Sequence, residues 1–403
     1  MVNRFRECLM MCLIILLTCC RAIAQTDSTQ LITTTTGTVQ PLRIAVLAPI
    51  YIDSVFTGTD YTGGNILPNY VLPGLDFYNG AMMAVDSLQK ENVPVEVWVY
   101  DTRKSYENTT MLEAEMDDKN FSLIIAYLSG ALEQQQLAAF AFSHNIPFIS
   151  GTYPNDAGVS GNPYFAIVNS TLKTHVQGIY NYVQHNYIGD KVYYITKKGG
   201  MEQRIKNYFD AMKARSYPLQ YTYVELPDNF TDADLLSKID SNSESVIVCG
   251  SLNVDFGTRL LKTINNSGAA KVFTVVGMPT WDDMDGLYDE DCKNVNIVFS
   301  TPYNYNRSDK LIAGLSDEYR SKFNGRPTDM MFKGFDQVYH FTHLLLRYHD
   351  SLFSHLSDTS FKISTVYNFQ PVRLKSTSFV PDFLENKKLY FVKMVGGSIK
   401  AVN

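Results

Sequence analysis

The sequence predicts an α/β protein with two doubly wound parallel-sheet lobes and a small β appendix at the C-terminus. Its 403 residues exceed an ordinary domain of about 100–200 residues, so two domains are expected. Hydrophobic residues make up 45% of the chain and charged residues 19%, a composition that can form two buried cores. From residue 42 onwards short apolar runs alternate with helical stretches, and this rhythm restarts near residue 191.

The first part of the rhythm predicts one sheet. Ala81, Val85 and Leu88 fall on one face of a helix, as expected of a helix that packs on buried strands. Apolar runs joined by such helices indicate a parallel sheet covered on both faces. The expected strands are residues 43–49, 95–100, 123–127 and 147–150, and the expected helices are residues 80–90, 106–118 and 133–143.

The second part predicts another sheet and a different tail. After residue 361 short alternating runs flank a Gly396-Gly397 turn, a pattern typical of a hairpin. The expected strands are residues 191–196, 221–225, 245–249, 271–276, 296–299, 388–395 and 398–402. The expected helices are residues 174–186, 200–215, 232–239, 257–265, 309–323 and 334–354.

The first 24 residues resemble a signal peptide. Arg4 and Arg6 supply a positive start, residues 9–20 are apolar, and Ala22-Ile23-Ala24 fits signal peptidase. We therefore expect an exported, periplasmic protein that begins at Gln25. Lipid anchoring at Cys19 or Cys20 is the alternative, although neither is preceded by the usual small residue.

The mature chain is expected to begin with a tether and to keep two free thiols. Residues 25–40 are rich in Thr, Ser and Gln and have too few apolar residues for a core. No later segment is apolar and long enough to span a bilayer. Cys249 ends one expected strand while Cys292 precedes another, which places them at opposite ends of a parallel sheet.

Charge and motifs exclude several functions. The net charge is −6 and no basic run occurs, so nucleic acid is not an expected partner. The chain has no Gly-x-Ser-x-Gly elbow, no phosphate loop and no His-Glu-x-x-His. His340 and His343 share a helix face, but aromatic and Leu residues surround them. We therefore expect no enzyme, no cofactor and no metal site.

Several motifs, in order, resemble the type I periplasmic binding proteins, the family that includes branched-chain amino-acid receptors of ABC importers. The resemblance covers nearly all of residues 41–403. Its motifs are the opening strand at 43–49, Gly80-Ala81-Met82-Met83-Ala84 in the first helix, the strand ending at Asp101, the strand and Ser/Gly loop at 123–130, the strand at 146–151 and Gly334-Phe335-Asp336-Gln337-Val338.

This resemblance implies two lobes that close on a ligand by hinge motion. We expect three crossovers between the lobes, near residues 165–170, 300–303 and 361–365. The expected organisation is a signal peptide at 1–24, a disordered tether at 25–40, lobe 1 at 41–168 with 303–360, and lobe 2 at 169–302 with 361–403.

Ligands of open α/β sheets lie beyond the carboxyl ends of the strands, which locates candidate residues in the first lobe. Hydroxyls and backbone N–H groups at a helix N-terminus suit a carboxylate, although Ser and Thr are equally common as simple helix caps. The candidates are Asp53, Ser129, Gly130, Ser150, Gly151, Thr152 and Tyr153.

The second lobe departs from the amino-acid receptors. Lys197-Lys198-Gly199-Gly200 stands where those receptors carry a stacking Tyr, and no Glu for the ligand ammonium follows Gly277. Asp282 or Asp283 could substitute, or could simply cap a helix. Trp281 is a candidate aromatic platform, with loop packing as the alternative. The candidates in this half are Gly199, Thr280, Trp281 and, beside a crossover, Tyr303.

The function expected from the sequence is a solute-binding protein that captures a small, carboxylate-bearing ligand for an ABC importer permease. The alternative is an envelope sensor or scaffold of the same fold that regulates cell-wall or envelope partners without transport. The missing second-lobe residues favour the alternative, while the Ser/Gly/Thr loops favour the receptor.

Overall fold

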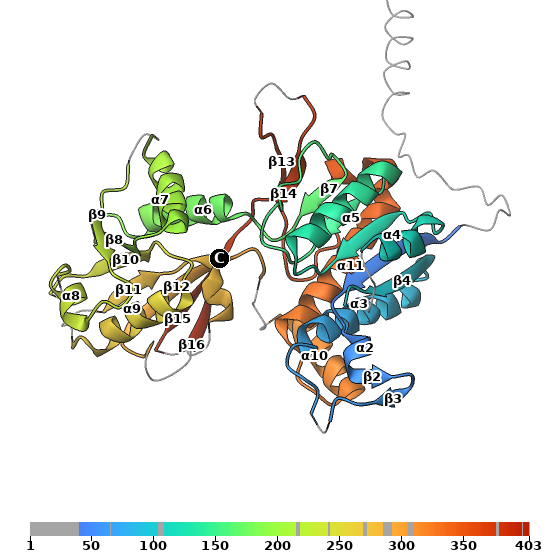
Figure 1. Cartoon of the computed structure of the whole chain (residues 1–403), viewed down its shortest axis with the longest axis horizontal. Coiled ribbons are helices and arrows are strands. Elements are labelled where there is room, and N and C mark those ends of the chain that lie inside the picture. Colours follow the sequence, from blue (N-terminus) through green and yellow to red (C-terminus); the bar gives the residue numbers. More distant parts are fainter. Residues whose placement is uncertain are drawn as a thin grey trace, which may run out of the picture. The chain divides into compact units, whose positions relative to one another are not determined.

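The computed structural model contains two seven-stranded sheets and a two-stranded hairpin (Figure 1). It describes residues 40–64, 66–103, 109–214, 218–240, 242–268, 272–284, 292–304, 309–375, 379–396 and 398–402. The expected signal peptide and residues 25–39 of the tether lie outside this range. None of the helices described combines the length and apolar character needed to cross a bilayer.

The first sheet has the strand order β13-β14-β7-β6-β5-β1-β4, and all its neighbours are parallel except β13 and β14. Its strands are β1 (Leu42–Ala48), β4 (Val95–Asp101), β5 (Leu123–Ala126), β6 (Phe148–Ser150), β7 (Phe165–Ile167), β13 (Phe369–Val372) and β14 (Phe383–Asn386). The accompanying elements are α2 (Ile52–Val55), β2 (Phe56–Thr57), β3 (Asp60–Tyr61), α3 (Leu72–Lys90), α4 (Thr109–Asp117), α5 (Ala131–His144), α10 (Lys310–Phe323), α11 (Asp329–Tyr348) and η4 (His349–Ser354).

Both faces of this sheet are covered, as expected of a doubly wound fold. Ile44 and Val46 of β1 pack with residues of α3, α10 and α11, whereas Ala45 and Leu47 pack with residues of α4 and α5. Successive side chains of a strand point to opposite faces, so every buried position of β1 is apolar. Strand β1 therefore appears in the sequence as a continuous run of hydrophobic residues.

Two glycines bring α3 and α11 close together. A Cβ on Gly80 would lie 1.9 Å from the carbonyl oxygen of Met331, and one on Gly334 would lie 2.1 Å from that of Phe77. Only glycine fits such an approach of two backbones. These are the glycines of two motifs that carry the family resemblance, so the motifs have a packing role.

The second sheet has the strand order β16-β15-β12-β11-β10-β8-β9, parallel from β12 to β9 and antiparallel at β15 and β16. Its strands are β8 (Lys191–Lys197), β9 (Thr222–Leu226), β10 (Ser245–Cys249), β11 (Phe273–Val276), β12 (Val295–Thr301), β15 (Tyr390–Val395) and β16 (Ser398–Val402). The helices are α6 (Leu172–Asn186), α7 (Gly200–Asp210), η1 (Ala211–Ala214), α8 (Asp232–Leu236), α9 (Val254–Asn266) and η2 (Pro279–Asp283). Two hydrophobic clusters lie on its two faces.

The chain passes between the sheets after β7, after β12 and after β14. The first two passages agree with the crossovers expected near 165–170 and 300–303. The third lies at residues 387–389 rather than at 361–365, because β13 and β14 pair in the first sheet. Consequently the tail is not a separate β appendix, because its strands extend both sheets. The expectation that all of residues 361–403 belong to lobe 2 is wrong for β13 and β14, which lie in the first sheet.

The two cysteines outside the leader, Cys249 and Cys292, are not joined by a disulfide, as expected, and both are buried, whereas the sequence predicted one buried thiol. Burial raises the pKa of the Cys249 thiol to about 12. Such a thiol stays protonated at neutral pH and is a poor nucleophile. Cys249 therefore has the structural role of a small hydrophobic core residue.

Candidate functional site

The loops after β5 and β6 meet at the carboxyl edge of the first sheet, because these strands are neighbours. Ser129 is exposed and Gly130 is the residue before α5. Thr152 Oγ1 donates to the carbonyl oxygen of Leu128 at 3.4 Å and so joins the two loops. Tyr153, also on the second loop, packs its ring against the core on the α4 and α5 face. The structure thus brings Ser129, Gly130 and Thr152 to one edge, as the sequence predicted.

Arg103 and Glu133 complete this edge, and the sequence reasoning missed both. Arg103 Nη1 lies 2.5 Å from Glu133 Oε1, and Arg103 Nη2 donates to Ser129 Oγ. The backbone N–H of Gly130 donates to Glu133 Oε2 at 3.2 Å. Gly is accepted as an N-cap residue, and a Glu three residues later can accept the N-cap N–H, so the Gly130-x-x-Glu133 spacing could have identified Glu133.

Asp101 organises the neighbouring loop after β1. Its carboxylate accepts backbone N–H groups from Ile50, Tyr51 and Arg103 on Oδ1, at 2.9, 3.1 and 2.9 Å, and from Ile52 on Oδ2 at 2.7 Å. Tyr51 has φ of 61°, which is uncommon for a residue other than glycine. Asp101 therefore fixes both the Tyr51 backbone and the start of the Arg103 segment.

Asp53 and Tyr51 border the same edge. Asp53 lies exposed in the first turn of α2. The rings of Tyr51 and Tyr70 pack edge to face, with centroids 5.0 Å apart. Tyr51 and Tyr70 therefore form an aromatic pair beside the loop that Asp101 holds.

Three predicted ligand residues, two of the first half and one beside a crossover, bond inside the first lobe instead. Ser150 is fully buried, and its hydroxyl donates to Gln134 Oε1 at 2.5 Å. The carbonyl oxygen of Gly151 accepts from Tyr303 Oη at 2.6 Å and from Gln337 Nε2 at 3.0 Å. Tyr303 is itself only 4% exposed. Because these polar groups bond to one another inside the lobe, Ser150, Gly151 and Tyr303 do not present them to a solute.

The carboxyl edge of the second sheet holds Gly199 and Thr280. Gly199 is exposed and precedes α7, while Thr280 Oγ1 donates to the carbonyl oxygen of Leu252 at 3.2 Å. Glu202, in the first turn of α7, is buried and accepts from Ser251 Oγ on Oε1 at 2.7 Å. Sequence reasoning overlooked Glu202 as an acidic group at this edge.

Trp281 is not an aromatic platform. It is fully buried in the core of the second sheet. A Cβ on Gly277 would lie 2.0 Å from its ring, and one on Gly257 would lie 2.9 Å from Nε1. The alternative prediction of loop packing is therefore correct, and the ring has no face open to a ligand.

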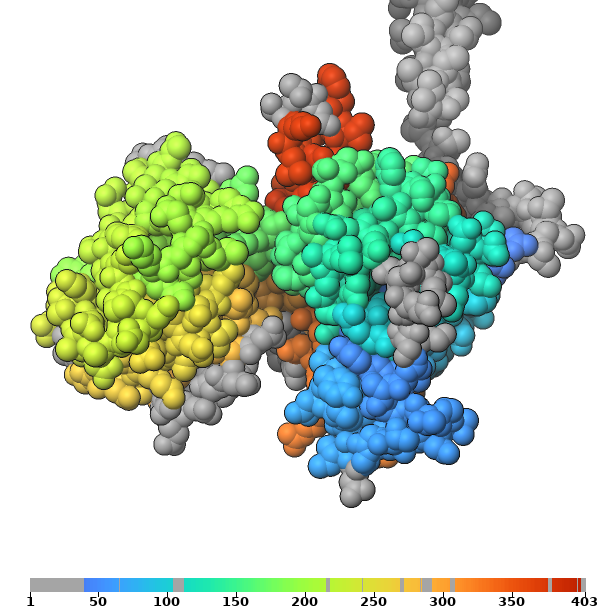
Figure 2. Space-filling view, in the orientation of Figure 1, coloured from blue at the N-terminus to red at the C-terminus, as the bar shows by residue number. Residues whose placement is uncertain are grey.

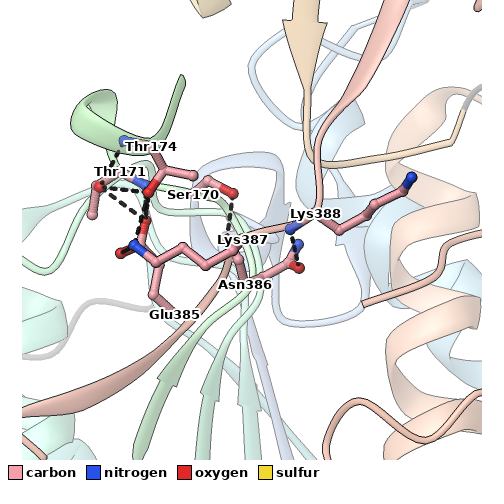
Figure 3. Close-up of polar contacts among 7 residues, drawn as sticks. All are labelled: Ser170, Thr171, Thr174, Glu385, Asn386, Lys387 and Lys388. Carbon is pink, nitrogen blue, oxygen red and sulfur yellow. Dashed lines mark hydrogen bonds and ion pairs between the residues drawn. The ribbon is translucent and has the colours of Figure 1, made fainter. Parts of the chain in front are cut away.

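A buried carboxylate ties the first crossover to the third (Figure 3). Glu385 Oε1 accepts from the N–H of Thr171 at 2.9 Å, from Thr171 Oγ1 at 2.8 Å and from Thr174 Oγ1 at 2.6 Å. Lys387 pairs with Glu385 and donates to Thr174 Oγ1 at 2.8 Å, whereas Lys388 points the other way. Burial alone raises the pKa of Glu385, but Lys387 and the threonine donors outweigh it and hold the pKa below its ordinary value.

Two further contacts join the crossovers. Ser170 Oγ donates to the carbonyl oxygen of Asn386 at 2.6 Å. His175 Nδ1 lies 2.8 Å from Ser300 Oγ, which links α6 to the end of β12. Burial lowers the pKa of His175 to about 4, so this histidine is neutral at pH 7. All three passages are therefore held by specific polar contacts.

Comparison with known proteins agrees with this architecture. Residues 70–354 match the family model described as periplasmic binding protein. No curated protein sequence matches the chain.

Solved structures share the fold. A branched-chain amino acid ABC transporter periplasmic ligand-binding protein from Burkholderia xenovorans has 12% identity and a TM-score of 0.60, covering 90% of this chain and 94% of its own. An ABC transporter substrate-binding protein from Desulfitobacterium hafniense, in complex with Leu, has 14% identity and a TM-score of 0.58, covering 90% and 100%. A branched-chain amino acid transporter substrate-binding protein from Streptococcus pneumoniae, in complex with isoleucine, has 17% identity and a TM-score of 0.54, covering 90% and 99%.

Proposed function

The chain belongs to the periplasmic binding protein family, a family of binding proteins rather than enzymes, and from this premise we propose that it is an exported receptor for a small, carboxylate-bearing solute. It would deliver this solute to an ABC importer permease in the cell envelope. Lobe 1 would comprise residues 41–168 with 303–386, and lobe 2 residues 169–302 with 387–403. The lobes would close on the solute about the three crossovers.

The observation that carries this proposal is the donor set of Arg103, Ser129 and Gly130. A guanidinium beside a hydroxyl and a backbone N–H is a common protein site for a carboxylate. The group already in contact with Arg103 and Gly130 is a carboxylate, that of Glu133. The structures in complex with Leu and with isoleucine support a solute of the amino-acid class.

Glu202 would bind a cationic group at the end of the solute opposite its carboxylate. It is an acidic group at the carboxyl edge of the second sheet, although it follows β8 and not β11, after which the resemblance implies a Glu for the ligand ammonium. Ser251 accounts for one donor to this carboxylate. We propose that its remaining acceptor capacity binds a cationic group of the solute.

A thermal-shift screen of amino acids, peptides, sugars and cell-wall fragments tests the receptor function. A solute at about 100 times its Kd stabilises the folded state by roughly 2.7 kcal/mol, so a true ligand raises Tm by several degrees. We expect Arg103→Ala to abolish the shift of a carboxylate-bearing ligand. Arg320→Ala is the matched control, because Arg320 forms an exposed ion pair with Asp317 on α10. A screen at millimolar solute without any shift would refute the proposal.

The second candidate is an envelope sensor or scaffold, and one surface favours it. Six large hydrophobic side chains are exposed within residues 52–72, namely Ile52, Phe56, Tyr61, Ile66, Tyr70 and Leu72. This segment lies in the blue part of the surface in Figure 2. Clustered exposed apolar side chains mark interaction surfaces. Replacing Phe56 and Tyr61 with Ser would disturb partner binding without changing any solute shift if this candidate is correct.

A further inference from the structure

At the edge of the first sheet, the Glu133 carboxylate accepts from the same donor groups that a solute carboxylate would use. One of its oxygens lies 2.5 Å from Arg103 Nη1, and the other accepts the N–H of Gly130 at 3.2 Å. Arg103 comes from the end of β4 and Glu133 from the first turn of α5, so the contact forms only in the folded lobe. A carboxylate with a donor on each oxygen is held as a free carboxylate ligand would be.

This contact lies within reach of solvent. The side chains of Arg103 and Glu133 are 30% and 18% exposed. Partly exposed ion pairs are weak, and their members exchange partners readily with ions from solution. A solute that brings its own carboxylate can therefore replace Glu133 at Arg103 without unfolding α5.

We propose that Glu133 is an internal competitor, a tethered carboxylate that occupies Arg103 and Gly130 until a solute carboxylate displaces it. This inference rests on the proposed carboxylate-binding function of the same edge. A tethered group acts at an effective concentration in the millimolar range, so simple monocarboxylates cannot displace it at low concentration. Only a solute with further contacts to the lobes binds at low concentration, so Glu133 sets an affinity threshold for carboxylate solutes.

The competition lowers the affinity for every carboxylate solute by the same factor. An ion pair of this exposure favours the occupied state by about fivefold. Because only the unoccupied state accepts solute, Glu133→Gln should raise the affinity by about fivefold. Solutes without a carboxylate should be unaffected, since they do not use Arg103.

Acetate tests the inference without knowledge of the natural ligand. The probe is the Tm of the full mature chain during a titration with sodium acetate against sodium chloride of equal ionic strength. Glu133→Ala should show a saturable rise of Tm with a midpoint in the millimolar range, as acetate fills the emptied position. The wild type should show the same rise only at about fivefold higher acetate, and Arg103→Ala with Glu133→Ala should show none.

Glu96→Ala is the matched control, because Arg43 of β1 and Glu96 of the neighbouring β4 also form a partly exposed ion pair, 3.0 Å apart and 38% exposed on both sides. Arg43 is also bonded to the carbonyl oxygen of Lys119, and the pair lies near the start of its strands. We expect this variant to respond to acetate as the wild type does.

A flat titration of Glu133→Ala, or an equal response of the double variant, would overturn the inference. If a solute from the screen still stabilised the wild type, the proposed function would stand while the competitor role failed. If acetate stabilised Glu133→Ala but no carboxylate solute stabilised any variant, the donor set would bind carboxylates and the receptor function would fail. Glu133→Gln, which keeps the shape of the side chain, guards against a folding defect in Glu133→Ala.

Discussion

Glu385 is the residue whose removal most directly tests the polar contacts between the first and third crossovers. It is 2% exposed and accepts three hydrogen bonds from Thr171 and Thr174, in addition to its ion pair with Lys387. Glu385→Ala would leave the Lys387 ammonium and the threonine donors without this acceptor. Loss of one member of a buried, hydrogen-bonded ion pair costs about 3–5 kcal/mol.

The expected magnitude lies at the lower end of that interval. The Lys387 side chain is 28% exposed, so its ammonium can turn to water after the substitution. We therefore expect Glu385→Ala to lower the free energy of unfolding by about 3 kcal/mol. Glu385→Gln keeps an acceptor oxygen for the threonine hydroxyls and should cost roughly 1–2 kcal/mol.

Urea unfolding at pH 7, with the midpoint and slope measured separately, is the assay. Asp317→Asn is the control, because Asp317 forms an exposed ion pair with Arg320, and it should change stability by less than about 0.5 kcal/mol. A change for Glu385→Ala as small as that of the control would refute the claim that these contacts stabilise the crossovers.

The pH dependence of the same variant gives an independent check. The pKa of Glu385 is lowered in the folded state, so its contribution is present above the ordinary glutamate pKa of about 4.3. The contribution is lost as the pH falls through the folded pKa. The difference between wild type and Glu385→Ala should therefore shrink below about pH 4. A difference that stayed constant from pH 7 to pH 3 would contradict the assignment of the charge.

Three other outcomes follow from the described contacts. Trp281→Ala should cost about 3–5 kcal/mol in urea unfolding and leave ligand affinity unchanged, because the ring is core; a selective loss of affinity would contradict this. Gly151→Ala places a Cβ 2.0 Å from Gln337 Oε1 and should cost about 1–3 kcal/mol, with partial recovery when Gln337→Ala is added. Burial lowers the pKa of His175 to about 4, so the unfolded chain binds its proton first, near pH 6.5, and stability falls as the pH drops from about 6.5 to about 4. Replacing His175 with Gln should flatten this part of the stability curve, and an unchanged slope would show that other groups cause it.

The site was predicted less completely than the fold. Sequence placed Ser129, Gly130 and Thr152 correctly at the edge of the first sheet, since these residues directly follow apolar runs. It also proposed Ser150 and Tyr303, which bond to the interior instead. A residue type and its place after a strand do not reveal whether the side chain turns outward or into the lobe.

The residues missed at the site depend on pairs that are distant in sequence. Arg103 meets Glu133 across 30 positions, and Glu202 meets Ser251 across 49. Helix capping explains the local half of the Glu133 arrangement, since Glu133 stands three residues after Gly130 and accepts its N–H. The identity of the second partner requires the packing of strands that the local pattern does not encode.

The sequence by itself determined the fold class and the order of most strands, because burial between two helical layers demands apolar runs that are visible locally. Tertiary structure alone decided the place of β13 and β14. Their sequences carry Pro371 and the polar residues Glu385 and Asn386, and β14 pairs with β7, Leu384 beside Ala166. The tertiary structure also decided that Trp281 lies in the core and that the Arg103 guanidinium pairs with Glu133. Whether a side chain is buried, and which acceptor a donor binds, depends on its neighbours in space, and those neighbours come from distant parts of the chain.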